Sequence, residues 1–183
     1  MRKLTCPPGT ETVGLLLGGF ADNIQGDETR PIMEKHGMVN LEPHTWYPVK
    51  MLLDALNELA EKASTTPAFV AIGLTIGEGV PLPADIENPT LEDVLMAWNN
   101  MYQDLHRGGD VGSILIEKIS DTHFKVALKS MIYPDDMNYG VLYAYGRRML
   151  PPGTAFNVYY DPDVTPLDQG GEGDTTYIHI QWE

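Results

Sequence analysis

The sequence has little cysteine, little positive charge and no long hydrophobic run. Cys6 is the single cysteine among 183 residues, which excludes an intrachain disulfide and a zinc site built from several cysteines. The formal net charge is −14, from 12 lysines and arginines against 26 aspartates and glutamates. Nucleic acid is therefore not an expected partner, because its phosphates need a basic surface. No apolar run approaches the roughly 18 residues that indicate a membrane span, and we expect a cytoplasmic protein.

The signatures of common catalytic and cofactor sites are also missing. The chain contains no Gly-x-Ser-x-Gly nucleophile elbow, no P-loop and no Gly-x-Gly-x-x-Gly motif. No two of the five histidines stand three or four residues apart, so no local metal-binding pattern exists. His123 and His179 fall on predicted strands, where we expect outward-facing side chains with ordinary hydrogen-bond partners. We predict no metal site and no catalytic residues.

Hydrophobic spacing predicts a helical first half, followed by strands and one further helix. We expect helices at 31–36, 49–62, 67–77, 90–105 and 139–149, and strands at 112–119, 122–130, 155–160 and 175–182. The segment 67–77 is apolar on all sides, which fits a buried strand or a buried helix, and the glycines that follow it favour a helix. The order αααα-ββ-α-ββ predicts an α+β fold, with N-terminal helices packed on a small antiparallel sheet.

The beginning of the chain differs in composition from the rest. Residues 1–30 mix proline, glycine and short apolar pieces, and we expect an N-terminal arm with weak structure of its own. Polar capping residues from Asp27 to Thr29, followed by Pro31, indicate the start of a helix. We expect residues 31–183 to form a single ligand-binding domain.

The distribution of aromatic residues along the sequence is compatible with the wall of a ligand-binding pocket. The predicted helix 90–105 carries an apolar stripe, and seven of the nine tyrosines lie between Tyr133 and Tyr177. A tyrosine joins an apolar ring to one polar group, which suits a pocket for a small hydrophobic ligand. The same pattern is also typical of an ordinary core and a dimer surface. His106, at the end of the helix, either complements the helix dipole or hydrogen-bonds a ligand. The candidate ligand-binding residues are Leu95, Trp98, Met101, Tyr102, His106, Tyr139, Leu142 and Tyr143.

The second half of the sequence resembles a known family. The stretch Ile132–Gly146, with the sequence IYPDDMNYGVLYAYG, is similar to the segment after the first hairpin of vinyl-4-reductase-type domains. The ending is similar too: FNVYY at 156–160, an acidic loop with Gly170, Gly171 and Gly173, and then YIHIQW at 177–182. Upstream, Trp46-Tyr47-Pro48 and its helix resemble the helical half of these domains. The resemblance covers about residues 30–183 and places the chain in a superfamily with TRAPP subunits and haem-nitric-oxide sensor domains.

The resemblance implies binding of a small hydrophobic molecule. Such domains are sensors or carriers of hydrocarbons, aromatics, lipid chains or tetrapyrroles, and they often form homodimers. Because the chain shows no output domain, we expect a stand-alone version. Two alternatives stay open, namely an enzyme acting on a tetrapyrrole-like substrate and a TRAPP-like assembly module without an exchangeable ligand.

The sequence departs from the family at two cofactor motifs. Many relatives bind zinc through cysteines near the end of the domain, where this chain has Asp174-Thr175-Thr176-Tyr177. Haem-binding relatives carry a helix-borne histidine and a Tyr-x-Ser-x-Arg motif. The nearest string here, Tyr143-Ala144-Tyr145-Gly146-Arg147, has a tyrosine in place of the serine. We therefore predict no cofactor, while His106 leaves haem open as an alternative.

Overall fold

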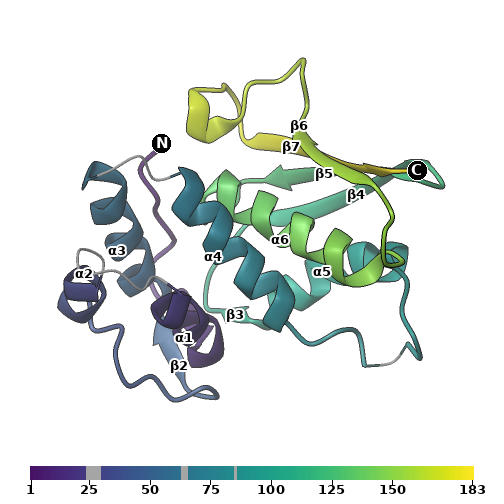
Figure 1. Ribbon diagram of the computed structural model, residues 1–183. Coiled ribbons are helices and arrows are strands. Elements are labelled where there is room, and N and C mark those ends of the chain that lie inside the picture. The colour runs from purple at the N-terminus through teal and green to yellow at the C-terminus, as the bar shows by residue number, and fades with distance from the viewer. Residues whose placement is uncertain (24–29, 63–65, 85) are drawn as a thin grey trace.

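A computed structural model describes residues 1–183 except 24–29, 63–65 and 85. The described residues form helices and two antiparallel sheets, with most of the helices in the first half of the chain (Figure 1). The elements are β1 (Glu11–Val13), α1 (Gly14–Asn23), α2 (Arg30–Lys35), β2 (Trp46–Pro48), α3 (Val49–Lys62), α4 (Thr66–Gly79), α5 (Leu91–Asp104), β3 (His106–Arg107), β4 (Ser113–Ser120), β5 (His123–Lys129), α6 (Asp135–Met149), β6 (Phe156–Tyr160), η1 (Leu167–Gln169) and β7 (Thr175–Trp182). The expected α+β class is confirmed. No helix among the described residues is long and apolar enough to cross a membrane.

The larger sheet has four antiparallel strands in the order β4-β5-β7-β6. Alternate residues of β5, among them Phe124 and Val126, are fully buried, as are Ile178 and Ile180 of β7. This period of two gives the sheet one apolar face, and α6 lies across it (Figure 1). The contact is close, since a Cβ atom added to Gly146 of α6 would come within 3.0 Å of the Ile180 Cδ1 atom.

The starts of helices α5 and α6 differ in how well the sequence predicted them. Helix α5 begins within one residue of the predicted start at 90, because Thr90 and Asp93 form a capping box in which the Thr90 N–H donates to the Asp93 carboxylate at 2.8 Å. Helix α6 begins at Asp135, four residues before the predicted start at Tyr139. Its first turn holds Asp135 and Asn138, polar residues that are nevertheless buried. A buried polar turn gives no apolar periodicity, which is why the sequence pattern missed it.

Helices α4 and α6 touch backbone to backbone. A Cβ atom added to Gly73 would overlap the Met137 carbonyl oxygen, and one added to Gly140 would overlap the Val70 carbonyl oxygen. Both helices lie side by side in Figure 1. The expected helix at 67–77 is thus confirmed, and its glycines serve helix–helix contact, which requires residues without side chains at the crossing point.

The expectation of a weakly structured arm at residues 1–30 is wrong for its described part. Strand β1 pairs with both β2 and β3 to form a second, three-stranded sheet. Leu17 and Phe20 of α1 are fully buried in the same core as the rest of the chain. The predicted order αααα-ββ-α-ββ therefore omits helix α1 and the three-stranded sheet that the structure contains. The capping signal at Asp27–Thr29 lies outside the described residues.

Arg2 fixes the first residues to the start of α6. Its guanidinium lies 3.1 Å from the carboxylates of both Asp135 and Asp168, and it donates at 2.9 Å to the carbonyls of Met131 and Tyr133. The two acids are also linked directly, because the backbone N–H of each donates to the carboxylate of the other. Burial and the neighbouring Asp135 raise the pKa of Asp168, so Arg2 is the cation that offsets this acidic pair.

The backbone contact of α4 and α6 predicts a strong effect of one methyl group. We expect Gly140→Ala to lower the free energy of unfolding by about 2–3 kcal/mol, because the new Cβ atom forces the helices apart. Gly18→Ala in α1 is the matched control. It has open space around its Cβ position, and the higher helix propensity of alanine should raise stability by up to about 1 kcal/mol. Urea denaturation measures both, and equal stability of the two variants would contradict the close contact.

Candidate functional site

Two adjoining cavities lie between the helices. The outer chamber, with a volume of about 260 Å³, is lined from α1 and α4, from the loop after α4 and from the residue after α5; its members are Leu15, Leu16, Gly19, Thr75, Ile76, Gly79, Val80, Pro81 and Leu105. The inner pocket, of about 40 Å³, adds residues of α5 and α6. Leu16, Ile76, Val80 and Leu105 line both cavities. These four side chains therefore form the boundary between the chamber and the pocket.

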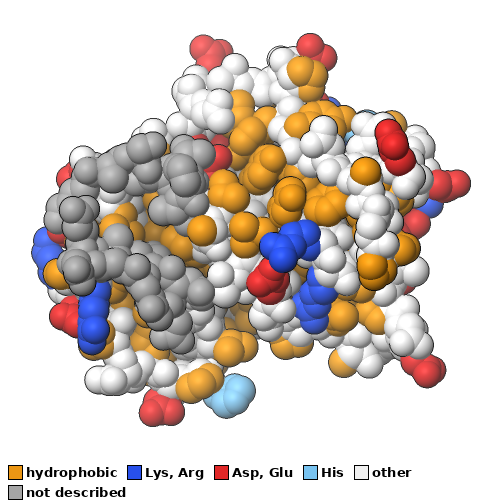
Figure 2. Space-filling view, viewed as in Figure 1, with side chains coloured by type: hydrophobic (Ala, Val, Ile, Leu, Met, Phe, Trp, Pro, Cys, Tyr) orange, Lys and Arg blue, Asp and Glu red, His pale blue; other side chains and the backbone are white. Residues whose placement is uncertain are grey.

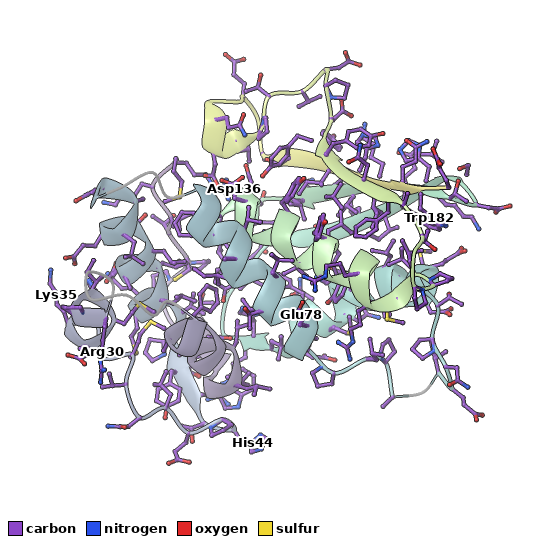
Figure 3. The ribbon with its side chains drawn as sticks, viewed as in Figure 1. Arg30, Lys35, His44, Glu78, Asp136 and Trp182 are labelled. Atoms are coloured by element: carbon purple, nitrogen blue, oxygen red, sulfur yellow. The ribbon has the colours of Figure 1, made fainter. Side chains whose placement is uncertain are left out.

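The outer chamber is apolar and uncharged. Its one polar side chain is Thr75, whose hydroxyl donates to the Ala71 carbonyl at 3.3 Å. No described lysine, arginine, aspartate or glutamate lines either cavity. Outside the chamber, Glu78 of α4 and Arg147 of α6 pair at 3.5 Å. Glu78 is at the C-terminal end of α4 (Figure 3), and charged side chains interrupt the hydrophobic surface over α4 and α6 (Figure 2). Such a lining suits a neutral, mainly hydrophobic molecule.

His106 lies in the wall of the inner pocket as a neutral imidazole. Its Nδ1 is 2.7 Å from the Tyr102 carbonyl oxygen, and its Nε2 is 2.7 Å from the Tyr133 hydroxyl. Because a carbonyl only accepts, Nδ1 must carry the proton, and Nε2 then accepts from Tyr133. Burial lowers the pKa of His106, which agrees with the uncharged form. Both ring nitrogens are thus engaged within the protein.

The structure brings together half of the candidate residues. Trp98, Met101, Tyr102 and His106 all line the inner pocket. They share one face of α5 and its end, and the apolar stripe in the sequence indicated that face.

The other candidates do not line the cavities. Leu95 and Leu142 are fully buried in the core. Tyr139 and Tyr143 lie toward β6, where the Tyr139 hydroxyl donates to the Val158 carbonyl at 2.6 Å and the Tyr143 ring packs 5.0 Å from that of Phe156. The side chains of these two tyrosines therefore contact β6 and do not contribute to the cavity walls.

Several lining residues were missed by the sequence analysis. The α1 residues were missed because residues 1–30 were expected to be an arm. The α4 residues were missed because a helix that is apolar all round has no distinguishable face. Tyr145 had a usable signal: Leu142, Tyr145 and Met149 share helical spacing on α6, whereas Tyr139 and Tyr143 fall on another side.

The histidines on the outer face of the sheet have protein partners, as expected. His123 Nε2 lies 2.9 Å from His179 Nδ1, and His179 Nε2 lies 3.2 Å from the Asp161 carboxylate. Lys125 also donates to Asp161, at 2.7 Å. Across the described part of the chain, no group of three histidine, cysteine or acidic side chains is arranged to hold a metal ion. This cluster is a hydrogen-bonded surface network.

Comparison with known proteins gives a fold and no family. No family model and no curated protein match the chain. A solved H-NOX protein from S. oneidensis superposes with a TM-score of 0.70 at 13% identity, covering 93% of this chain and 96% of that one. A variant of the T. tengcongensis H-NOX protein gives 0.66 at 11% identity, covering 93% and 94%. An oxygen-binding H-NOX domain related to soluble guanylate cyclases gives 0.62 at 12% identity, covering 93% and 92%.

At this level of identity the likeness shows the fold alone. The fold agrees with the α+β class expected from the sequence, and the wider superfamily stays a prediction. The narrower resemblance to vinyl-4-reductase-type domains stays a prediction.

The shared fold makes haem a ligand to consider, but the residues as arranged do not fit it. A haem iron bound through histidine needs a free imidazole nitrogen, and the Nε2 of His106 is bonded to Tyr133. The pocket at His106 and the adjoining chamber measure about 40 and 260 Å³, which is at the lower end of the range of about 300–1,000 Å³ for ligand pockets. The two carboxylates of haem would also find no cation among the described residues that line the cavities.

The neutral state of His106 predicts a pH dependence of stability. Because burial lowers its pKa below the ordinary 6.5, the unfolded chain takes up a proton there first as the pH falls. The stabilisation that comes from the neutral form of His106 is therefore complete well above pH 6.5, and it declines as the pH falls through this value. We expect a loss of about 1 kcal/mol between about pH 7.5 and 5.5.

Urea titrations of wild type, His106→Gln and His44→Gln test this prediction. The His106→Gln variant should lack this part of the pH dependence, whereas His44→Gln should keep it. His44 is exposed and points away from the body of the protein (Figure 3). An unchanged pH slope in His106→Gln would show that His106 does not stay neutral.

Proposed function

We propose that this chain binds a small, uncharged, mainly hydrophobic molecule in the outer chamber and acts as a sensor or carrier of it. The observation that carries the proposal is the chamber itself, about 260 Å³ of apolar volume that protein side chains leave unfilled. Protein interiors are normally close-packed, and an apolar cavity of about 150 Å³ is enough to bind benzene. Each buried methylene of a ligand adds about 0.8 kcal/mol, so a molecule of nine or ten carbons would bind usefully.

Binding has more support than catalysis. A proton-transfer pair needs titratable groups free to reach the substrate. The one histidine of the pocket is held on both nitrogens by Tyr102 and Tyr133, and the Tyr102 hydroxyl is held by the Val111 carbonyl at 2.7 Å. An enzyme acting on a tetrapyrrole-like substrate is therefore the less favoured alternative.

Haem is the second candidate ligand, favoured by one observation. H-NOX structures share this fold, and His106 is a buried histidine at the pocket wall. Haem would require Tyr133 to leave His106 and the pocket to widen. The proposed small ligand requires neither change, and for that reason we prefer it.

Native mass spectrometry of the freshly purified protein is the first experiment. A releasable small mass would identify a ligand that copurifies, and the same spectrum shows whether the chain is the homodimer that the resemblance leads us to propose. A complex with another protein and no small mass would favour the assembly-module alternative. Haem uptake with a Soret band that His106→Ala abolishes would favour haem.

A chamber-filling substitution tests the proposed site. We expect indane, an uncharged bicyclic hydrocarbon, to bind the wild type, and Ile76→Phe to weaken that binding by about tenfold or more because the larger ring occupies the chamber. Ala71→Leu on the exposed side of the same helix is the control and should bind as the wild type does. Calorimetric titration measures all three. Wild-type protein that does not bind indane, or Ile76→Phe that binds it equally well, would contradict the proposal.

A further inference from the structure

We propose that the inner pocket receives a single hydrogen-bonding oxygen of the ligand, so that the ligand is an uncharged alcohol or ketone on an apolar body. This inference rests on the proposed function, since the apolar body would occupy the outer chamber. It adds to that proposal that the ligand has a polar end, that this end enters the inner pocket, and that the ligand is an alcohol or a ketone.

Three polar groups of the inner pocket lack a partner within the described protein. The Tyr145 hydroxyl makes no hydrogen bond, although the residue is only 1% exposed. The indole N–H of Trp98, in a residue 5% exposed, makes none either. Asn138 donates to the Pro134 carbonyl at 3.1 Å, and its amide oxygen accepts no hydrogen bond. All three residues line the inner pocket.

These groups face free volume rather than packed protein. Among the described residues, no fully enclosed side-chain nitrogen or oxygen lacks a hydrogen bond. The unpartnered atoms of Tyr145, Trp98 and Asn138 must therefore keep some accessible surface, and the free volume that all three residues share is the inner pocket. The other polar side chains of the pocket, Tyr102, His106 and Tyr133, are bonded within the protein.

Unused polar groups at a buried site indicate what the ligand supplies. A buried donor or acceptor left without a partner destabilises a protein, so such groups are usually paired. Tyr145 and Trp98 offer donors, and Asn138 offers an acceptor. A ketone oxygen accepts from the first two, and a hydroxyl can in addition donate to the third.

The small volume of the inner pocket and its uncharged lining restrict the chemical class of the ligand further. About 40 Å³ exceeds the 10–15 Å³ or so that one water needs, and it is too small for a ring. It therefore holds a group of one or two heavy atoms. An ionised carboxylate or amine would be buried there without a counterion, which is strongly unfavourable. Burial raises the pKa of Tyr145, so its hydroxyl keeps the proton that it donates.

Two probes with the same skeleton test the inference. Indane and 1-indanone differ by one carbonyl group, and calorimetry gives the affinity of each. We expect Tyr145→Phe to weaken 1-indanone binding by about fivefold, the effect of one neutral hydrogen bond, and to leave indane binding unchanged. Tyr139→Phe is the matched control on the same helix. Its hydroxyl is bonded to the Val158 carbonyl away from the cavities, so both affinities should stay at wild-type values.

A second readout is independent of affinity and stability. The infrared carbonyl band of bound 1-indanone should lie at lower frequency in wild-type protein and return toward its apolar-solvent position in Tyr145→Phe. Trp98→Phe, which removes the other donor, provides a second variant should Tyr145→Phe fold poorly.

The outcomes separate this inference from the proposed function. If both probes bind and Tyr145→Phe and Trp98→Phe change neither their affinity ratio nor the carbonyl band, the inner pocket holds only water and the inference is overturned. The proposed function then stands. If neither probe binds the wild type, both fail. A selective loss of 1-indanone affinity supports the inference.

Discussion

The direct backbone contact between α4 and α6 determines where the site lies. Glycines at positions 73 and 140 bring each helix against a carbonyl group of the other, a separation that any side chain would increase. At the end of α4, Arg148 of α6 donates to the carbonyls of Val80 and Gly77, at 2.7 and 3.3 Å. This contact caps the C-terminus of α4 with a cation, where the helix dipole favours one. With α4 held against α6 in this way, Ile76 of α4 lines both cavities, together with residues of α1 and α5.

The acidic chain keeps its charge away from this region. Arg2 holds the buried carboxylates of Asp135 and Asp168 at the opposite end of α6 from Arg148. The first turn of α6 can therefore carry buried acids without bringing charge to the cavity wall. The same contact attaches the start of the chain to the second half of the fold, and Asn57 of α3 holds Leu4 through both backbone groups, at 2.9 Å each. The first residues are therefore part of the packed structure.

Whether the sequence could predict an element depended on whether neighbouring residues or distant ones cause its burial. Helices α3 and α5 have one apolar and one polar face, so their spacing alone predicted them. Helix α5 and its end supplied the four candidate residues that line the inner pocket. Helix α1 could not be predicted, because it is glycine-rich and its burial depends on α4, a segment far away in the sequence. The start of α6 was missed for a similar reason, since the partners of the buried Asp135 lie far away in the sequence, among them Arg2, 133 residues earlier. Short-range patterns do not contain such long-range pairs.

The fold itself leaves the ligand undetermined. Structures at 11–13% identity share the architecture, yet one architecture can serve different chemistry through a few side chains. In this chain the hydrogen bond between Tyr133 and His106 is the contact that bears on whether His106 can bind a metal ion or a haem iron. It occupies the nitrogen that a metal would need, while burial lowers the pKa of the imidazole and favours its neutral form. Function on this fold must therefore be argued from the lining residues.

For the proposed ligand, the contrast between the charged surface and the uncharged cavity lining implies selection by charge. The formal net charge of −14 repels anions before they reach the mouth of the chamber. A cation is attracted to the surface but would find no counterion among the described residues that line the cavities, so it would lose its hydration without compensation. Neutral molecules meet neither barrier. Among these, the apolar chamber favours hydrophobic bodies, and the unpaired groups of Tyr145, Trp98 and Asn138 favour those that also carry one hydrogen-bonding oxygen.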